Sequence, residues 1–404
     1  MISHLGTFDV ENYGDLLYPI VLKHLLKKDP SLKVRHYSPL PVMGPQEAGF
    51  ETSAIATLFT STAPATTLII GGGDILRTDW DTFASHYSTN SYHSLRRSIG
   101  PLDACSYLLR TKIPRGAPAA FFVRRFRKHR LNYSEVGPFL IDSDMLPQGS
   151  VISYMSCGVP HEFSSSESES VRRVFDQASF IYLRDEQSAA KLRRAGFERE
   201  IHVAPDLAIT LSDQFDREML NRRGREILSR IGIERDSPFL CFQCKPYPSF
   251  DEEAIVNELK RYQERTNCPV VLLPIGYCHG DDKFLQSLAG RSGGSLKYAN
   301  VNSIADIMSV IVASDLFIGT SLHGNITAAS YGIPHLFGPL PVDKIAGFVD
   351  VMKLPPELQL RSWTELNDKI DFAVELGREY FSARAAQAKT RVYEVMNQLL
   401  LAQR

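Results

Sequence analysis

Residues 315–325 read DLFIGTSLHGN, in which a short apolar run leads into a small polar turn and then into a helix-forming segment. An apolar run with no polar alternation is typical of a strand buried in a parallel sheet. In such sheets ligands bind beyond the carboxyl ends of the strands, which is where the polar residues of this segment stand. The pattern therefore predicts an α/β fold whose functional residues directly follow strands.

The same alternation of apolar runs and amphipathic helical stretches extends along the 404-residue chain in both directions. The predicted strands lie near residues 2–8, 34–37, 67–70, 151–155, 180–183, 201–204, 239–242, 270–273, 316–318 and 335–337. The predicted helices lie near residues 16–28, 171–178, 186–195, 252–266, 304–313, 326–331 and 372–401. This length and pattern predict two Rossmann-like α/β domains that face each other across a cleft, with a long C-terminal helix.

The boundary between the two domains is predicted at residue 213, where a turn closes the first half of the chain. The N-terminal domain then covers residues 1–213 and the C-terminal domain covers residues 214–404, and the charged stretch 216–230 is expected to link them. Residues 80–148 break the alternation and are predicted to form an irregular insertion. Its basic run, residues 124–130, is expected to be a solvated face; the alternative is contact with a phosphate-bearing acceptor or an anionic membrane.

Composition and charge narrow the classes of function. Hydrophobic residues make up 44% of the chain, charged residues 23%, and the net charge is −1, a balance that argues against nucleic-acid binding. We find neither a secretory signal nor an apolar run near the roughly 20 residues that span a bilayer. The six cysteines are scattered, which favours a reducing, cytoplasmic compartment. Cys241 and Cys244 have the two-residue spacing of a metal or redox motif, but Cys241 falls in the predicted strand 239–242 and no second Cys or His pair follows, so no metal is predicted.

Small and polar residues after the strands of the first domain are candidates for ligand contact. The glycine triplet 71–73 can bring backbone amides close to a ligand, or it can form a tight turn. Arg184 offers a planar fork of donors to a carboxylate or phosphate, and the alternative is a surface pair with Asp185. Asp15 can cap the helix that follows it and still contribute to a cleft. The substrate-binding candidates in this domain are Asn12, Gly72, Gly73, Asp74, Gly158 and Arg184.

The turn after the strand 316–318 carries the densest set of candidates in the second domain. A helix predicted to begin near Asn325 offers unpaired amides and a partial positive charge to an anion. His323 beside that anion can act as a general acid at neutral pH, or it can be a histidine satisfied within the turn. The substrate-binding candidates here are Thr320, Ser321, Asn325, His279 in the loop 274–282, and Lys344.

Taken together, these motifs resemble the polysaccharide pyruvyl transferase family in their order along the chain. The matching segments run from about His4 to Met352 and are NYGD (12–15), GGGD (71–74), LRDxxS (183–188), APD (204–206), LP (273–274), GxxLHG (319–324) and DKxxGF (343–348). The resemblance implies a two-domain fold similar to that of GT-B glycosyltransferases. It also implies phosphoenolpyruvate as donor substrate, no cofactor, and a lipid-linked, nucleotide-linked or glycan sugar as acceptor.

Residue roles follow from the same resemblance. The family's donor-binding arginine matches Arg184 and its catalytic histidine matches His323, whereas the arginine that many members carry two residues before the histidine is Ser321 here. In the implied reaction His323 protonates the methylene carbon of phosphoenolpyruvate. One sugar hydroxyl then adds to C2 and a second displaces phosphate, which gives a cyclic ketal. Asp15 or Asp206 is the expected base.

Two other functions stay open at this point. One is a glycosyltransferase of the same fold that uses a nucleotide sugar, and the other is a glycan-binding relative without activity. The replacement of an arginine by Ser321 motivates both, because a hydroxyl does not replace a guanidinium charge at an anion site. Peripheral contact with a membrane-bound, lipid-linked acceptor is an additional expectation.

Overall fold

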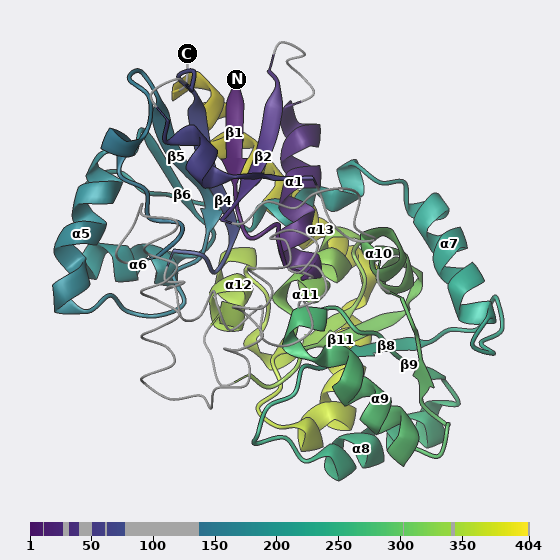
Figure 1. Ribbon diagram of the computed structural model, residues 1–404. Coiled ribbons are helices and arrows are strands. Elements are labelled where there is room, and N and C mark those ends of the chain that lie inside the picture. The colour runs from purple at the N-terminus through teal and green to yellow at the C-terminus, as the bar shows by residue number, and fades with distance from the viewer. Residues whose placement is uncertain are drawn as a thin grey trace, which may run out of the picture. The chain divides into compact units, whose positions relative to one another are not determined.

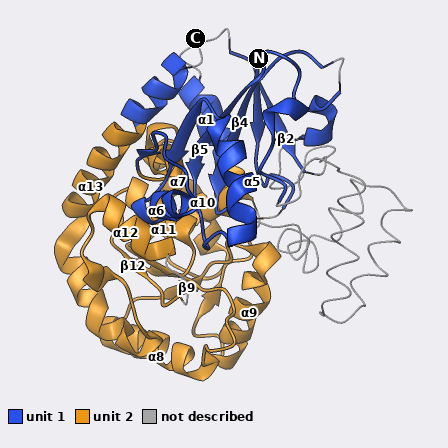
Figure 2. Cartoon of the chain, turned by 90° about the vertical axis from the view of Figure 1, so that its left-hand side faces the viewer, with its two compact units in different colours: residues 1–11, 18–204, 393–404 blue, residues 12–17, 205–392 orange. Residues whose placement is uncertain are grey.

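The computed structural model describes residues 1–10, 12–26, 32–39, 51–60, 63–76, 137–301, 303–340 and 344–402 (Figure 1). Most of the predicted insertion, including the basic run 124–130, lies outside these residues. The chain forms two compact units (Figure 2). Unit 1 comprises residues 1–11, 18–204 and 393–404, and unit 2 comprises residues 12–17 and 205–392. Each unit contains one parallel sheet.

The sheet of unit 1 has seven strands in the order β3-β2-β1-β4-β5-β6-β7. Their bounds are β1 (Ile2–Leu5), β2 (Val34–Ser38), β3 (Ser53–Ala54), β4 (Thr67–Gly73), β5 (Val151–Cys157), β6 (Phe180–Leu183) and β7 (His202–Val203). All of the pairings are parallel, and β1 lies between β2 and β4 with Ile2 opposite both Val34 and Thr67. The chain thus builds the sheet outward from β1 in two directions, which is the doubly wound order of a Rossmann-like domain.

Helices cover the sheet of unit 1 on both faces. On one side of the strands lie α5 (Ser165–Asp176) and α6 (Glu186–Arg194), and on the other side lies α1 (Tyr13–Leu26) (Figure 1). Buried apolar side chains of α5 and α6 pack with those of the central strands; the rings of Tyr154 on β5 and Phe175 on α5 lie 4.5 Å apart. This packing explains why the central strands read as nearly continuous apolar runs.

The glycine triplet lies within strand β4 rather than in a loop after it, so the predicted end of this strand at residue 70 was wrong. Gly72 has a φ of 97°, a conformation that favours glycine. A β-carbon at this position would stand 2.3 Å from the ring of Tyr18, which packs against the strand. Packing of α1 on the sheet therefore accounts for this glycine without any ligand.

The sheet of unit 2 has five parallel strands in the order β10-β9-β8-β11-β12. Their bounds are β8 (Leu240–Gln243), β9 (Val270–Leu272), β10 (Lys297–Tyr298), β11 (Leu316–Gly319) and β12 (His335–Phe337). The helices of this unit are α7 (Arg217–Ser229), α8 (Glu252–Thr266), α9 (Asp281–Arg291), α10 (Ile304–Ala313), α11 (Leu322–Ser330) and α12 (Lys344–Met352), and α13 (Leu366–Ala402) begins in it. The predicted α/β class with a long C-terminal helix is confirmed.

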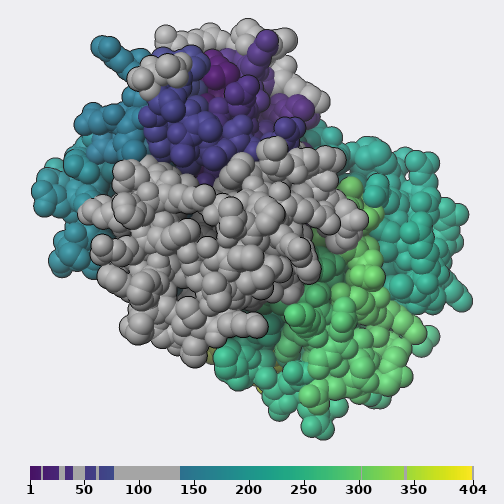
Figure 3. Space-filling model, in the orientation of Figure 1, coloured from purple at the N-terminus to yellow at the C-terminus, as the bar shows by residue number. Residues whose placement is uncertain are grey.

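The charged stretch 216–230 is a helix of unit 2 and not a linker, which corrects the prediction. Asp216 caps α7 by accepting a hydrogen bond of 2.8 Å from the backbone N–H of Met219. Gly224 on its inner face lets α7 approach α10 closely, because a β-carbon there would stand 2.3 Å from the carbonyl oxygen of Ser309. The charged side chains occupy the outer face of α7, whose atoms are visible at the surface in Figure 3.

Several helices depart from their predicted bounds, among them α5, which begins at Ser165 rather than at residue 171. Helix α1 begins at Tyr13 rather than at residue 16, so Pro19 lies inside the helix and not in its first turn. Helix α13 begins at Leu366, six residues before the predicted start, and is broken at Gly377, where φ is 68° and ψ is 168°. Across the described residues, no helix combines the length and the apolar character needed to cross a membrane.

Candidate functional site

The turn that joins β11 to α11 in unit 2 is held by hydrogen bonds from its own side chains. Helix α11 begins at Leu322, three residues earlier than predicted, because Ser321 caps it by accepting a hydrogen bond of 3.2 Å from the N–H of Gly324. The N–H of Ser321 in turn donates to Oε1 of Gln243 at 2.7 Å. The serine at this position therefore has a structural role as the helix cap.

His323 lies in the first turn of α11 and faces an acidic side chain. Its Nε2 is 3.6 Å from Oδ2 of Asp206, and both residues are buried, with 9% and 1% of their surfaces exposed. The other carboxylate oxygen of Asp206 accepts a hydrogen bond of 3.0 Å from the N–H of Ala208 and so caps the 3₁₀ helix η3 (Leu207–Asp213). Two of the three residues predicted to be catalytic therefore lie side by side.

The segment 12–15 packs directly on His323. A β-carbon on Gly14 would stand 2.1 Å from Nδ1 of His323, so only glycine leaves room for the imidazole ring here. The hydroxyl group of Tyr13 is 2.8 Å from Oγ1 of Thr327, and that threonine hydroxyl donates to the carbonyl oxygen of His323 at 2.8 Å. The first turn of α1 thus fixes both the ring and the backbone of His323.

Asp15 is the third residue of α1, so it lies within the first turn rather than before the helix, where the capping interpretation had placed it. The side-chain amide of Asn12 donates to Oδ2 of Asp15 at 2.7 Å. Asn12 also forms an antiparallel bridge with Gly276, so the first loop of the chain lies beside the predicted loop 274–282. His279 is half-buried in the 3₁₀ helix η4 (Tyr277–His279) of that loop, with its ring against Gly276.

Thr320 and Asn325, both predicted to bind substrate, make hydrogen bonds within the protein. Oγ1 of Thr320 accepts from the N–H of Lys245 at 3.1 Å. The side-chain amide of Asn325 donates to the carbonyl oxygens of Gly319 and Ser321 at 2.8 and 2.9 Å. These residues shape the turn that carries His323. Lys344, half-buried, is the first residue of α12.

A second group of predicted residues meets at the ends of β4, β5 and β6 in unit 1. Arg184 is 4% exposed and forms an ion pair with Asp74, and its Nε lies 3.7 Å from Oδ2 of Asp185. A β-carbon on Gly158 would stand 2.4 Å from Oδ1 of Asp74 and 2.9 Å from the guanidinium carbon. Arg184 is thus a buried side chain, and its predicted pair with Asp185 is present but buried rather than at the surface. Asp185 caps α6 by accepting a hydrogen bond from the N–H of Ser188.

A buried carboxylate near the site escaped the sequence interpretation. Oδ2 of Asp281 accepts hydrogen bonds from Nε2 of Gln243 at 2.6 Å and from the N–H of Gly276 at 2.9 Å. Asp281 is 1% exposed, and burial raises its pKa to about 6. A polar residue at the end of an apolar strand, Gln243, is the signal that could have pointed to this pair.

We expect Asp281→Asn to flatten the pH dependence of stability between pH 4 and pH 6. A raised pKa means that folding favours the protonated acid, so its stabilising contribution is full below about pH 4 and is lost as the pH rises through 6. The raised pKa of Asp281 corresponds to a stabilisation of the protonated acid by roughly 2–3 kcal/mol, which the neutral amide of asparagine retains at higher pH. Thermal unfolding from pH 4 to pH 8 measures it, with Asp282→Asn as the control. Parallel pH curves for wild type and Asp281→Asn would contradict this expectation.

Cys241 on β8 and Cys244, which follows this strand, are buried thiols. Burial raises the pKa of both Cys241 and Cys244 well above the usual range, so both are protonated at neutral pH. In the part of the chain that the structure describes, no three side chains of His, Cys, Asp or Glu gather as metal ligands.

Solved structures share this architecture at low sequence identity. UDP-N-acetylglucosamine 2-epimerase from Rickettsia bellii aligns with a TM-score of 0.54 and 12% identity, covering 99% of this chain and 95% of the epimerase. A variant of the wall teichoic acid polymerase TagF, in a structure with CDPG, aligns with a TM-score of 0.50 and 12% identity, covering 100% of this chain and 88% of the polymerase. The likeness shows the fold alone, which is GT-B-like.

The sequence comparison matches part of the chain to one family model. Residues 147–337 match the family model of polysaccharide pyruvyl transferase, which confirms the predicted resemblance over this part of the chain. Arg184, Asp206 and His323 lie inside the matched range, and the segments 12–15 and 71–74 lie outside it. The match connects the chain with transferases of polysaccharide biosynthesis. Comparison with curated protein sequences finds no match.

Proposed function

We propose that this protein transfers a pyruvyl group from phosphoenolpyruvate to two hydroxyls of a sugar and so forms a cyclic ketal. The observation that carries the proposal is the buried contact between Nε2 of His323 and the carboxylate of Asp206, within the range that matches the family. An imidazole held beside a buried carboxylate is suited to general acid catalysis.

His323 is the proposed acid. Transfer of its proton to the methylene carbon of phosphoenolpyruvate makes C2 electrophilic, and a sugar hydroxyl adds there. A second hydroxyl then displaces phosphate, so the products are the ketal and inorganic phosphate. Asp206, 3.6 Å from Nε2, attracts the positive charge of the imidazolium before the proton leaves.

The two candidate bases, Asp15 and Asp206, differ in how far they are buried. Asp206 is 1% exposed and faces His323, so we assign it to the imidazole rather than to the acceptor. Asp15 is half-buried and holds Asn12 by a hydrogen bond, and its partial exposure suits a group that takes a proton from a sugar hydroxyl. Asp15 is therefore the proposed base.

Arg184 is the proposed contact for the negative groups of the donor. Its guanidinium is buried and already oriented by Asp74, and pre-oriented donors stabilise developing charge without reorganisation. The same pairing lowers the affinity for the donor, because a donor carboxylate or phosphate has to share the guanidinium with Asp74. Of the remaining candidates, we propose Lys344 and His279 as substrate contacts, and Thr320, Ser321 and Asn325 as residues that hold the turn.

Release of phosphate from phosphoenolpyruvate tests this function. The acceptors are nucleotide-linked, lipid-linked and free glycans, and the proteins are wild type, His323→Ala and a matched control, His161→Ala, at an exposed histidine. We expect acceptor-dependent release that falls at least about 100-fold in His323→Ala, the scale of a lost general acid, and is unchanged in His161→Ala.

The outcome that would contradict the proposal combines two measurements. Absence of phosphate release with every acceptor, together with no thermal stabilisation by phosphoenolpyruvate, would reject the proposal. Stabilisation by a nucleoside diphosphate in the same assay would then indicate a nucleotide-sugar enzyme.

A further inference from the structure

Two buried helices of unit 2 carry the His323–Asp206 pair at their amino ends. The 3₁₀ helix η3 follows Asp206, and α11 carries His323 in its first turn. Runs of 3₁₀ helix longer than three or four residues are uncommon, because their hydrogen bonds have poor geometry. At seven residues, η3 therefore depends on tertiary contacts to keep its shape.

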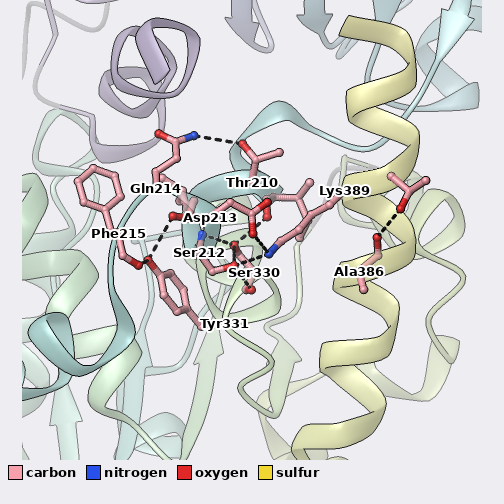
Figure 4. Close-up of polar contacts among 12 residues, drawn as sticks. Thr210, Ser212, Asp213, Gln214, Phe215, Ser330, Tyr331, Ala386 and Lys389 are labelled. Atoms are coloured by element: carbon pink, nitrogen blue, oxygen red, sulfur yellow. Dashed lines mark hydrogen bonds and ion pairs between the residues drawn. The ribbon is translucent and has the colours of Figure 1, made fainter. Parts of the chain in front are cut away.

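Such contacts join the carboxyl ends of the two helices (Figure 4). The N–H of Ser212 donates to Oγ of Ser330 at 3.0 Å, and Oγ of Ser212 donates to the carbonyl oxygen of Ser330 at 2.6 Å. Oγ of Ser330 donates to the carbonyl oxygen of Ile209 at 2.7 Å. Each serine thus bonds the backbone of the other helix, which fixes how the helices are aligned along their length.

A lysine from α13 completes this arrangement. Nζ of Lys389 donates to Oγ of Ser212 at 2.6 Å and to Oδ1 of Asp213 at 2.6 Å (Figure 4). The lysine side chain is 17% exposed, and the carboxylate of Asp213 offsets its charge. We call these four residues, Ser212, Asp213, Ser330 and Lys389, the Lys389 cluster.

The lengths of the two helices relate the Lys389 cluster to the candidate site. From Asp206 to Ser212, η3 rises by about 12 Å at ~2.0 Å per residue. From His323 to Ser330, α11 rises by about 10.5 Å at ~1.5 Å per residue. The two segments agree in length to within about 1.5 Å, so the alignment set by the serines at one end determines which residues face each other at the other end.

The contact at the amino ends is sensitive to this alignment. At 3.6 Å, Nε2 of His323 and Oδ2 of Asp206 are about 0.7 Å farther apart than in an ordinary N–H···O hydrogen bond. A displacement of η3 by a fraction of its rise per residue would therefore either close this contact or abolish it.

We propose that the Lys389 cluster positions Asp206 against His323, which makes Lys389 and Ser212 positioning residues for the acid. The inference rests on the proposed function for its effect on turnover, but its effect on the imidazole does not depend on that function. It assigns a positioning role to Lys389 on α13, a helix that contains none of the sequence motifs described above.

Nuclear magnetic resonance of the imidazole nitrogens tests the inference directly. In wild type we expect Nε2 of His323 to carry its proton toward Asp206, with the signal assigned by comparison with His323→Ala. In Lys389→Met the two neutral tautomers should mix, and kcat should fall about tenfold with little change in KM, the effect of a small misplacement. Lys389→Arg, which retains the charge and the donors, should restore both readouts.

A lysine on the same helix, tested as Lys369→Met, is the control and should behave as wild type. If Lys389→Met does not fold, Ser212→Ala replaces it in the same measurements. Imidazole signals and kcat that equal those of wild type would overturn the inference, and so would a lower melting temperature with unchanged imidazole signals. Altered signals in a protein that releases no phosphate from phosphoenolpyruvate would support the positioning role and reject the proposed reaction.

Discussion

Gly14→Ala should lower kcat about 100-fold while the protein stays folded, because the new methyl group displaces the imidazole of His323. The β-carbon would stand 2.1 Å from Nδ1, whereas non-bonded atoms pack at about 3.5–4.0 Å. His323 is buried, so its ring has to move by on the order of 1 Å away from its contact with Asp206. Steady-state phosphate release from phosphoenolpyruvate measures the effect.

A second glycine provides a matched control for this substitution. Gly290 lies within α9, and a β-carbon there would have no atom within 4 Å. Gly290→Ala should therefore leave kcat unchanged and stabilise the protein by roughly 0.5–1 kcal/mol, the usual gain in a helix. Equal kcat for wild type and Gly14→Ala would show that the contact with Gly14 does not set the position of His323.

The parallel sheets could be predicted because each central strand is recognisable from its own apolar run, without knowledge of the strands beside it. Strands such as β5 and β6 are buried on both faces, so nearly every residue is apolar and the run stands out in the sequence. The edge strands β3 and β10 have two residues each and were missed, since so short a segment has no period to detect, although the equally short edge strand β7 was predicted within residues 201–204. The stretch 216–230 was misread because its charge masked the helical spacing of Leu220, Ile227 and Leu228.

The candidate site could be predicted only in part, because position along a strand does not reveal contact partners. His323 and Asp206 were both identified, but their contact joins residues far apart in the sequence. The close fit of Gly14 to the imidazole, and the hydrogen bond between Gln243 and Asp281, depend on packing that no local pattern encodes. The cap formed by Ser321 was detectable, since serine before an apolar helical run is a typical start signal.

The role of Ser321 also explains why this position does not hold the arginine that many polysaccharide pyruvyl transferases carry there. A side chain with a hydroxyl at this position accepts the hydrogen bond from Gly324 that begins α11, whereas an arginine there cannot form this cap. The serine is thus explained by local structure, with no need to assume a loss of activity. Arg184, buried beside Asp74, then becomes the guanidinium on which donor binding is expected to depend most.

Asp74→Ala should destabilise the protein by roughly 2–3 kcal/mol, because it leaves the guanidinium of Arg184 buried without its main partner. The estimate lies below the usual cost of a broken buried pair, since Asp185 remains 3.7 Å from Nε of Arg184. Arg184→Met should cost less, because Asp74 is 30% exposed and its carboxylate can be hydrated. Denaturant unfolding of both variants measures the difference.

An exposed ion pair in the same unit provides the control for Asp74→Ala. It shows how much stability is lost when an ion pair is removed without leaving a buried charge. Glu162 and Arg194 have side chains 54% and 59% exposed, and Glu162→Ala should change stability little because water already solvates both groups. Thermal stabilisation by phosphoenolpyruvate should disappear in Arg184→Met and persist in Glu162→Ala. If Arg184→Met is the less stable of the two pair variants, or still responds to phosphoenolpyruvate, then Arg184 serves the packing of unit 1 rather than the donor.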